Sequence, residues 1–272
     1  MRIAILADIH GNLPAFEAVL QQIRHQAPDL LIIAGDVVVG APDSAACWQL
    51  AQSLACPIVR GNHERYLSHF GTPNGDPAWQ TEQFTPVQWA VAQFTTAERA
   101  AIATLPLSLS VPAAPALHIV HAAATSDRET LPPYKTDAEI AAMFPNVQER
   151  WIIRGHDHLA RTQPWRDKMI VTVGSVGLPM DGNPAAQYLL LDATTDGWQV
   201  QHQAVDYPLS ATLERFRSTR YIEQTGVMGR LFLREAATAT HHFVPFLRLY
   251  RQWSQEAPLS LQAALDRYLT HY

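Results

Sequence analysis

Short apolar runs alternate with amphipathic segments over the first 60 residues, and this order limits the folds open to the chain. Residues 3–7 and 30–34 are apolar throughout, as expected for strands that are buried on both faces. Residues 14–24 place apolar side chains on one helical stripe, residues 44–54 predict a second helix, and residues 57–60 predict a third strand. This β-α-β-α-β order predicts a parallel sheet with right-handed crossovers.

Polar residues that can ligate a metal ion follow each of these three runs. Asp8 and His10 follow the first, Asp36 follows the second, and Asn62 and His63 follow the third. Ligands bind beyond the carboxyl ends of the strands in such sheets. A single Asp after a strand is usually a cap or turn residue. The inference therefore depends on several strand ends together.

Two later strand-like runs end in the same way, one at His121 and the other at His156 and His158. His156 and His158 are two positions apart, so on an extended strand end their side chains can point the same way. Each of the seven candidate ligands offers an oxygen or an imidazole nitrogen, and none is a thiolate. They are Asp8, His10, Asp36, Asn62, His121, His156 and His158.

This donor set suits Mn, Fe, Zn, Ni or Co better than it suits a structural zinc site. Seven ligands are too many for one small ion with an open position, but they suit two ions bridged by a carboxylate. We therefore expect two divalent or trivalent ions per chain, with Mn supporting activity. The other histidines are interpreted as surface or packing residues. They are His25, His69, His118, His202, His241, His242 and His271.

The remaining pattern divides the chain into residues 1–208 and a helical extension, residues 209–272. Further strands are predicted at residues 169–173 and 187–191, and an edge strand at residues 199–205. The extension is too aromatic for a solvated tail. We expect it to pack on the first domain, and the alternatives are a homodimer contact or a lid.

The composition limits the kinds of partner that the protein can bind and the cell compartment in which it is expected. The formal net charge of -5 provides no basic footprint, which argues against a general nucleic-acid binder. The cysteines, Cys47 and Cys56, form no disulfide framework, which fits a reducing compartment. With no apolar run long enough for a membrane span, we expect a cytoplasmic protein without a membrane partner.

Taken together, the strand-end motifs resemble the calcineurin-like metallophosphoesterase superfamily, over about residues 1–205. The matching motifs are Asp8-x-His10, Gly35-Asp36, Gly61-Asn62-His63-Glu64, His121 and Gly155-His156-Asp157-His158. The resemblance is to the small bacterial and archaeal phosphoesterases. It implies an α/β fold, a four-layer sandwich of two mixed sheets packed face to face with helices outside.

The resemblance also implies a role for each site residue. The implied ligands of the first metal are Asp8, His10, Asp36 and His158. Those of the second are Asp36, Asn62, His121 and His156, which makes Asp36 the bridge. His63 corresponds to a catalytic histidine that is not a ligand. One departure is Thr172-Val173-Gly174-Ser175, where relatives typically show Asn-Pro-Gly-Ser.

The implied activity is hydrolysis of a small phosphoester substrate, in which a metal-bound hydroxide attacks phosphorus. A phosphodiesterase or nucleotide phosphatase is the leading interpretation. The alternatives are an activity like that of serine/threonine protein phosphatases or diadenosine tetraphosphatases, or a non-enzymatic metal-binding interaction module. Protein phosphatases and diadenosine tetraphosphatases also show the Arg-Gly-Asn-His-Glu of residues 60–64.

Three residues are candidates for substrate binding. Asn12 could offer its amide to phosphate, with a turn or helix cap as the equal alternative. Arg60 begins the segment shared with those phosphatases, and Arg128 could pair with a second phosphate. Tyr134 could stack on a base.

Overall fold

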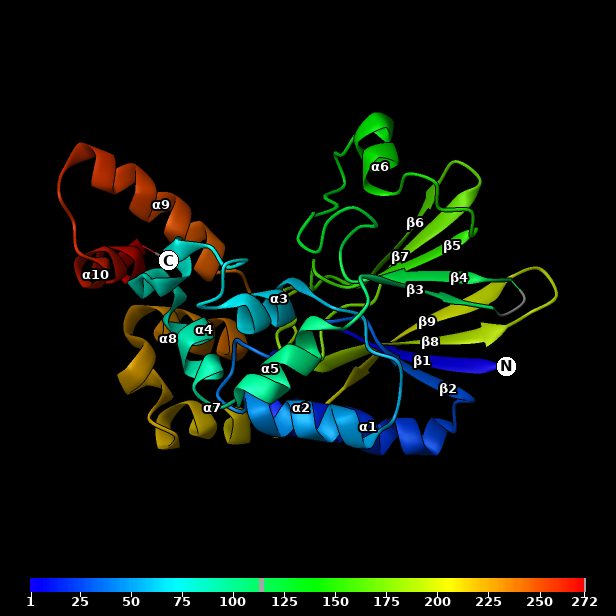
Figure 1. The fold of residues 1–272 in the computed structure, drawn as a ribbon, viewed down its shortest axis with the longest axis horizontal. Coiled ribbons are helices and arrows are strands. Elements are labelled where there is room, and N and C mark those ends of the chain that lie inside the picture. The colour runs from blue at the N-terminus through cyan, green and yellow to red at the C-terminus, as the bar shows by residue number, and fades with distance from the viewer. Residues whose placement is uncertain (113–114, 272) are drawn as a thin grey trace.

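Two β-sheets packed face to face form the centre of the computed structural model, which describes residues 1–112 and 115–271 (Figure 1). The four-stranded sheet has the order β2-β1-β8-β9, with β1 (Arg2–Leu6), β2 (Leu30–Ile33), β8 (Ala186–Ala193) and β9 (Trp198–Val205). The five-stranded sheet has the order β3-β4-β5-β7-β6, with β3 (Ser108–Val111), β4 (Leu117–Val120), β5 (Trp151–Arg154), β6 (Arg161–Trp165) and β7 (Lys168–Thr172). Both sheets are mixed, because β1–β2 and β4–β5–β7 are parallel while their other neighbours are antiparallel.

Helices cover the outer face of each sheet. The helices before the C-terminal region are α1 (Leu13–Gln26), α2 (Ser44–Ser53), α3 (Asn62–His69), α4 (Thr85–Val91), α5 (Thr96–Ala103) and α6 (Asp137–Met143), with 3-10 turns η1 (Pro77–Gln80) and η2 (Glu82–Phe84). Phe16 of α1 and Trp48 of α2 pack on the four-stranded sheet, whereas Ile140 of α6 packs on the five-stranded one. A separate apolar cluster, which includes Ile5 and Ile153, fills the space between the sheets. The predicted four-layer sandwich is confirmed.

Two edge strands, β3 and β6, were not predicted because their sequences are too polar. β6 alternates between more and less exposed residues and contains Pro164, which an edge strand tolerates because its N–H groups need not all pair. β3 is short, and two of its four residues are exposed. Neither has the continuous apolar run from which the buried strands were predicted.

The third apolar run, residues 57–60, forms no full strand, and the prediction of one is wrong. It pairs with β2 at a single bridge between Ile33 and Ile58. Pro57 has no N–H to donate, and the Arg60 N–H bonds the Pro106 carbonyl at 2.8 Å instead of continuing along β2. The segment therefore leaves the sheet before it reaches Gly61.

Four helices form the C-terminal region: α7 (Leu209–Ser218), α8 (Tyr221–Thr238), α9 (Phe243–Glu256) and α10 (Leu261–His271). Figure 1 shows them beyond one end of the sheets, opposite the N-terminus. Thr212 of α7 donates to Asn12 Oδ1 at 2.7 Å, and the Tyr221 hydroxyl of α8 donates to the Gly40 carbonyl at 2.5 Å. These contacts join α7 and α8 to loops of the sandwich; Tyr272, the last residue of the expected extension, lies outside the described residues.

Within the described ranges, no helix is both long and apolar enough to cross a membrane.

Candidate metal centre

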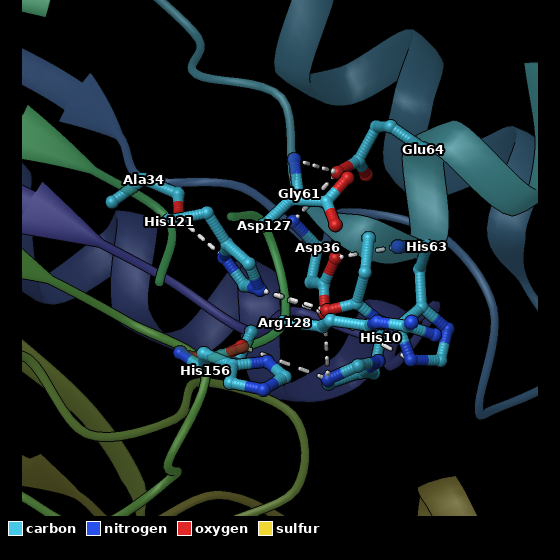
Figure 2. A network of polar contacts seen from close by, with 12 residues as sticks. His10, Ala34, Asp36, Gly61, His63, Glu64, His121, Asp127, Arg128 and His156 are labelled. Atoms are coloured by element: carbon cyan, nitrogen blue, oxygen red, sulfur yellow. Dashed lines mark hydrogen bonds and ion pairs between the residues drawn. The ribbon is translucent and has the colours of Figure 1, made fainter. Parts of the chain in front are cut away.

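The candidate ligands meet at the carboxyl ends of β1, β2, β4 and β5, beside the first turn of α3 (Figure 2). The loops are tied together by backbone bonds, such as that from the Asp8 N–H to the Gly35 carbonyl at 3.1 Å. Ligand atoms lie within 4.8 Å of one another in each of three overlapping groups. The groups are Asp8, His10 and His158; Asp36, His121 and His156; and His10, Asp36 and His63. The remaining candidate, Asn62, places Oδ1 3.2 Å from Nε2 of His121.

Three histidines are held in the orientation that a metal ligand needs. In His10, His121 and His158, Nδ1 bonds a backbone carbonyl oxygen. The acceptors are Val39 at 2.8 Å, Ala34 at 2.8 Å and Leu178 at 2.6 Å, respectively. A carbonyl can only accept, so Nδ1 of each ring carries a proton and Nε2 faces the other ligands.

The pKa values of these rings reflect burial and the neighbouring carboxylates. Burial lowers the pKa of His10 to about 3 and that of His156 to about 4, so both rings are neutral at pH 7. Burial also acts to lower the pKa of His121, but the Asp36 carboxylate raises it to about 10. A proton on His121 Nε2 therefore competes with a metal ion for the same lone pair.

Asp36 occupies the position shared by the ligand groups. Its Oδ2 lies 3.2 Å from Nε2 of His121 and 3.8 Å from Nε2 of both His10 and His63. Its other oxygen, Oδ1, accepts the His63 backbone N–H at 2.9 Å. One oxygen thus remains directed at both groups, as a bridging carboxylate requires.

Asp8 provides a direct test of whether a cation fits. Its Oδ2 accepts the backbone N–H of His156 at 2.9 Å. Its Oδ1 is buried and accepts no hydrogen bond from any residue that the structure describes, with Nε2 of His158 and of His10 at 3.4 and 3.8 Å. Beside it, Nε2 of His10 and Nε2 of His158 are only 3.0 Å apart. An unsatisfied buried carboxylate oxygen is costly, and a cation among these three atoms would satisfy it.

Five of the seven candidate ligands have left-handed backbone conformations. They are Asp8 (φ 57°), His10 (φ 51°), Asp36 (φ 54°), His156 (φ 71°) and His158 (φ 57°). Positive φ is uncommon for residues other than glycine, and such strain concentrates at functional sites. The backbone at these strand ends is bent to direct side chains inward rather than to continue the sheets.

Glu64 is a site residue whose role the sequence analysis did not assign. Its carboxylate is fully buried and accepts the backbone N–H groups of Asp36 at 2.8 Å, Val37 at 2.7 Å and Gly61 at 2.8 Å. Burial and the nearby Asp36 carboxylate raise the pKa of Glu64 to about 7. Glu64 thereby fastens the Asp36 loop to the start of α3. The sequence signal for it was its place three residues after Gly61, the N3 position from which a glutamate reaches back to the N–H of the N-cap residue.

Small residues allow the loops to approach closely. A Cβ on Gly61 would lie 2.1 Å from Asp36 Oδ1, so only glycine fits there. Where the sequence departs from its relatives, Ser175 still contributes to the site. Its hydroxyl donates to the Asp8 carbonyl at 2.8 Å and accepts the Leu178 N–H at 2.8 Å, and Leu178 in turn holds His158.

His63 lies at the edge of the cluster and differs from the ligand histidines. Its Nδ1 is buried but bonds no described residue, so the ring is not fixed by a carbonyl. Its side chain is 18% exposed, whereas those of His10 and His121 are 2% and 0% exposed. Burial lowers its pKa, and Asp36 acts in the opposite direction.

The three candidate substrate-binding residues lie in two different environments. Asn12 is buried and uses both amide atoms within the protein, which corresponds to the helix-cap alternative and leaves nothing for phosphate. Its partners are Ala15 N (3.3 Å), Thr212 Oγ1 (2.7 Å), the Gly177 carbonyl (2.9 Å) and the Tyr207 hydroxyl (3.2 Å). Arg60 and Arg128 instead line one pocket beside α3. Tyr134 is 86% exposed and lies outside that pocket lining.

Residues 1–196 match the family described as the calcineurin-like phosphoesterase superfamily domain. A metallophosphoesterase from Sphaerobacter thermophilus is similar in structure, with a TM-score of 0.69, 21% identity, and coverage of 88% of this chain and 99% of that one. A hypothetical protein from Pyrococcus horikoshii has a TM-score of 0.72 and 17% identity, covering 89% and 99%. At these identities the likeness concerns the fold.

An uncharacterized protein of Methanocaldococcus jannaschii is 37% identical over 62 residues, which are 23% of this chain. The matched stretch spans about a quarter (26%) of that relative's length.

Proposed function

Because the chain belongs to the calcineurin-like phosphoesterase superfamily, we propose that it is a hydrolase that uses two metal ions to cleave phosphodiesters or nucleotides. One observation carries the proposal: two groups of oxygen and imidazole ligands converge on Asp36, and Asp36 directs a single oxygen at both. A single-ion site would not need two such groups. Manganese is the ion we expect to support activity.

The residues divide between the two ions around this shared carboxylate. Asp8, His10 and His158 would hold one ion, while Asn62, His121 and His156 would hold the other. When bound, such ions offset charge on phosphoryl oxygens and make a water more acidic near neutral pH. The carbonyl-anchored rings hold their Nε2 atoms in fixed positions, so little reorganisation is needed on binding, although an ion has to displace a proton from His121.

His63 is the residue we assign to proton transfer. It is adjacent to the cluster, more exposed than His10 or His121, and not anchored through Nδ1. A ring in this position can be reached by a substrate and can donate to the leaving oxygen or to a phosphoryl oxygen. General acid catalysis of this kind is typically worth about 10²–10⁴-fold.

The test is metal analysis combined with a substrate screen. The protein is stripped, reloaded with Mn, and assayed on bis-p-nitrophenyl phosphate, p-nitrophenyl phosphate, cyclic nucleotides, dinucleoside polyphosphates and a phosphopeptide. We expect about two ions per chain and preferential hydrolysis of the diester or of nucleotides. A metal content that saturates near one ion contradicts the bridged site. Two bound ions with no hydrolysis of any compound would instead indicate a metal-binding interaction module.

A further inference from the structure

A pocket of about 520 Å³ opens beside the metal centre and is not used by the ligands described above. We call it the arginine pocket; its lining includes Arg60, Arg65, Trp79, Asp127 and Arg128. Arg60 precedes Gly61, at the start of α3, whose first residue is the candidate ligand Asn62. Figure 2 draws Asp127 and Arg128 in the same close view as the metal-centre residues. The pocket and the metal centre therefore share one helix and its approach.

A short path of aromatic contacts connects the two. The rings of His63 and Tyr66 are 5.5 Å apart, and those of Tyr66 and Trp79 are 5.1 Å apart. Trp79, in the pocket wall, thus lies within about 11 Å of the proposed proton donor. This distance is within the length of a small molecule that has its reacting phosphoryl group at the metal centre and a second phosphoryl group at the pocket.

The charges of the pocket do not balance within the protein. Arg65 is paired with Asp127 through two bonds, of 2.6 and 3.0 Å, and stacks over Tyr66 at 4.9 Å. By contrast, the Arg60 and Arg128 side chains have no hydrogen bond or ion pair with any described residue, and Nε of Arg60 is buried. The lining also contains Asp76, whose Oδ1 accepts the Ala78 N–H at 2.9 Å, so three arginines face two aspartates and leave an excess of one positive charge, with neither Arg60 nor Arg128 paired to a carboxylate.

The pKa of a neighbouring histidine also indicates a local excess of positive charge. Burial lowers the pKa of His69, and the positive charges of Arg60 and Arg65 lower it further. The chain as a whole carries a formal charge of -5, so an excess of cationic groups at this place is a local feature. Paired N–H donors of a guanidinium match phosphate oxygens in geometry and in charge.

The aromatic residues argue against a base as the group recognised here. Trp79 is only 6% exposed and its ring contacts Tyr66, so it forms a wall rather than an open stacking platform. We propose that the arginine pocket binds a second phosphoryl group of the substrate, through Arg60 and Arg128. The preferred substrates are then small phosphoesters that carry at least two phosphoryl groups, an inference that rests on the hydrolase function proposed above.

The experiment compares adenosine 3′,5′-bisphosphate with adenosine 5′-monophosphate, which differ by one phosphoryl group. Both are measured as competitive inhibitors of bis-p-nitrophenyl phosphate hydrolysis and, separately, by titration calorimetry on the Mn-loaded protein. We expect the wild-type protein to bind the bisphosphate about tenfold or more tightly than the monophosphate, because charge-assisted hydrogen bonds are among the strong ones.

Variants of the two arginines test the assignment. Arg60→Gln and Arg128→Gln should each reduce the preference for the bisphosphate about tenfold, and Arg128→Lys should keep part of it. Arg217→Gln is the matched control, because Arg217 is an exposed arginine of α7 with no side-chain hydrogen bond or ion pair to any described residue. Thermal unfolding checks that every variant is folded.

The inference is overturned if the wild-type protein binds the two ligands with equal affinity. It is also overturned if the arginine variants lose affinity for both ligands to the same extent. The calorimetric arm separates this from a failure of the hydrolase proposal. A protein that hydrolyses nothing but still prefers the bisphosphate retains the pocket assignment, whereas a protein that hydrolyses the diester without that preference loses it.

Discussion

Replacing Glu64 by Gln tests whether one buried carboxylate holds the metal centre in shape. Oε2 of Glu64 accepts the N–H groups of Asp36 and Gly61, both at 2.8 Å, while Oε1 accepts that of Val37 at 2.7 Å. Glutamine has the same shape but only one acceptor oxygen. Whichever way its amide turns, an NH₂ group faces at least one buried backbone N–H that then has no acceptor.

The cost follows from the number of donors left without a partner. An unsatisfied buried donor costs about 1–3 kcal/mol, and one or two are created here, so we expect a loss of about 2–4 kcal/mol. For a chain of this size, 1 kcal/mol shifts the melting temperature by about 2–4 °C, which gives a fall of roughly 5–15 °C. Since the loosened backbone carries Asp36, the affinity for both metal ions should also fall.

The assay is thermal unfolding at pH 8, above the Glu64 pKa of about 7, with metal content measured on the same samples. Glu98→Gln is the matched control, because Glu98 occupies the same N3 position in α5 and accepts the Thr95 N–H at 2.7 Å in a bond at the protein surface. Because water can replace this surface bond, Glu98→Gln should lower the melting temperature only slightly. If Glu64→Gln lowers the melting temperature no more than Glu98→Gln and retains both ions, the positioning role of Glu64 is refuted.

Three further predictions concern the ligands, the proton donor and the C-terminal helices. Asp36→Asn should weaken both metal sites, whereas His158→Ala should leave about one tightly bound ion per chain by metal analysis. His63→Ala should keep both ions, losing little kcat/KM on a nitrophenyl ester but about 10²–10⁴-fold on an alkyl phosphate ester; loss of an ion would make His63 a ligand. Burial raises the pKa of Glu235 from 4.5 to about 7. Between these pH values the folded protein keeps a proton that the unfolded chain releases, so the free energy of unfolding should fall by up to about 3 kcal/mol as pH rises from 4.5 to 7. Glu235→Gln should remove that part of the pH dependence of the melting temperature; an unchanged dependence would contradict the buried neutral carboxyl.

The fold was predictable where a buried strand gives the sequence a continuous apolar run. β1, β2, β4, β5 and β8 are near-continuous apolar runs because both faces of each sheet are covered, and the residues after such runs must leave the sheet. Ligand-type residues at those exits were therefore identified without any knowledge of how the two sheets pack. The sequence could not show which strands share a sheet, because β8 reaches β1 from far along the chain.

Residues that act through tertiary contacts escaped prediction. Glu64 is an ordinary capping residue in sequence, and only the fold places the Asp36 loop over its carboxylate. Asn12 is the opposite case, a residue that the sequence suggested for phosphate binding and that tertiary contacts occupy. The Thr212 hydroxyl of α7, which begins at Leu209, donates to its amide oxygen. Contacts between positions about 200 residues apart leave no local pattern to detect.

Backbone strain at the ligands explains why the site needs so much support. A left-handed residue other than glycine costs of order 1 kcal/mol, and five ligands, among them Asp8, Asp36 and His156, adopt this conformation. Buried hydrogen bonds offset the strain: Glu64 holds the Asp36 N–H, and Asp8 holds the His156 N–H. These bonds belong to the protein itself and do not depend on a bound ion. The ligand geometry is therefore maintained by the fold, so that binding energy is available for the metal ions instead of being consumed in bending the strand ends.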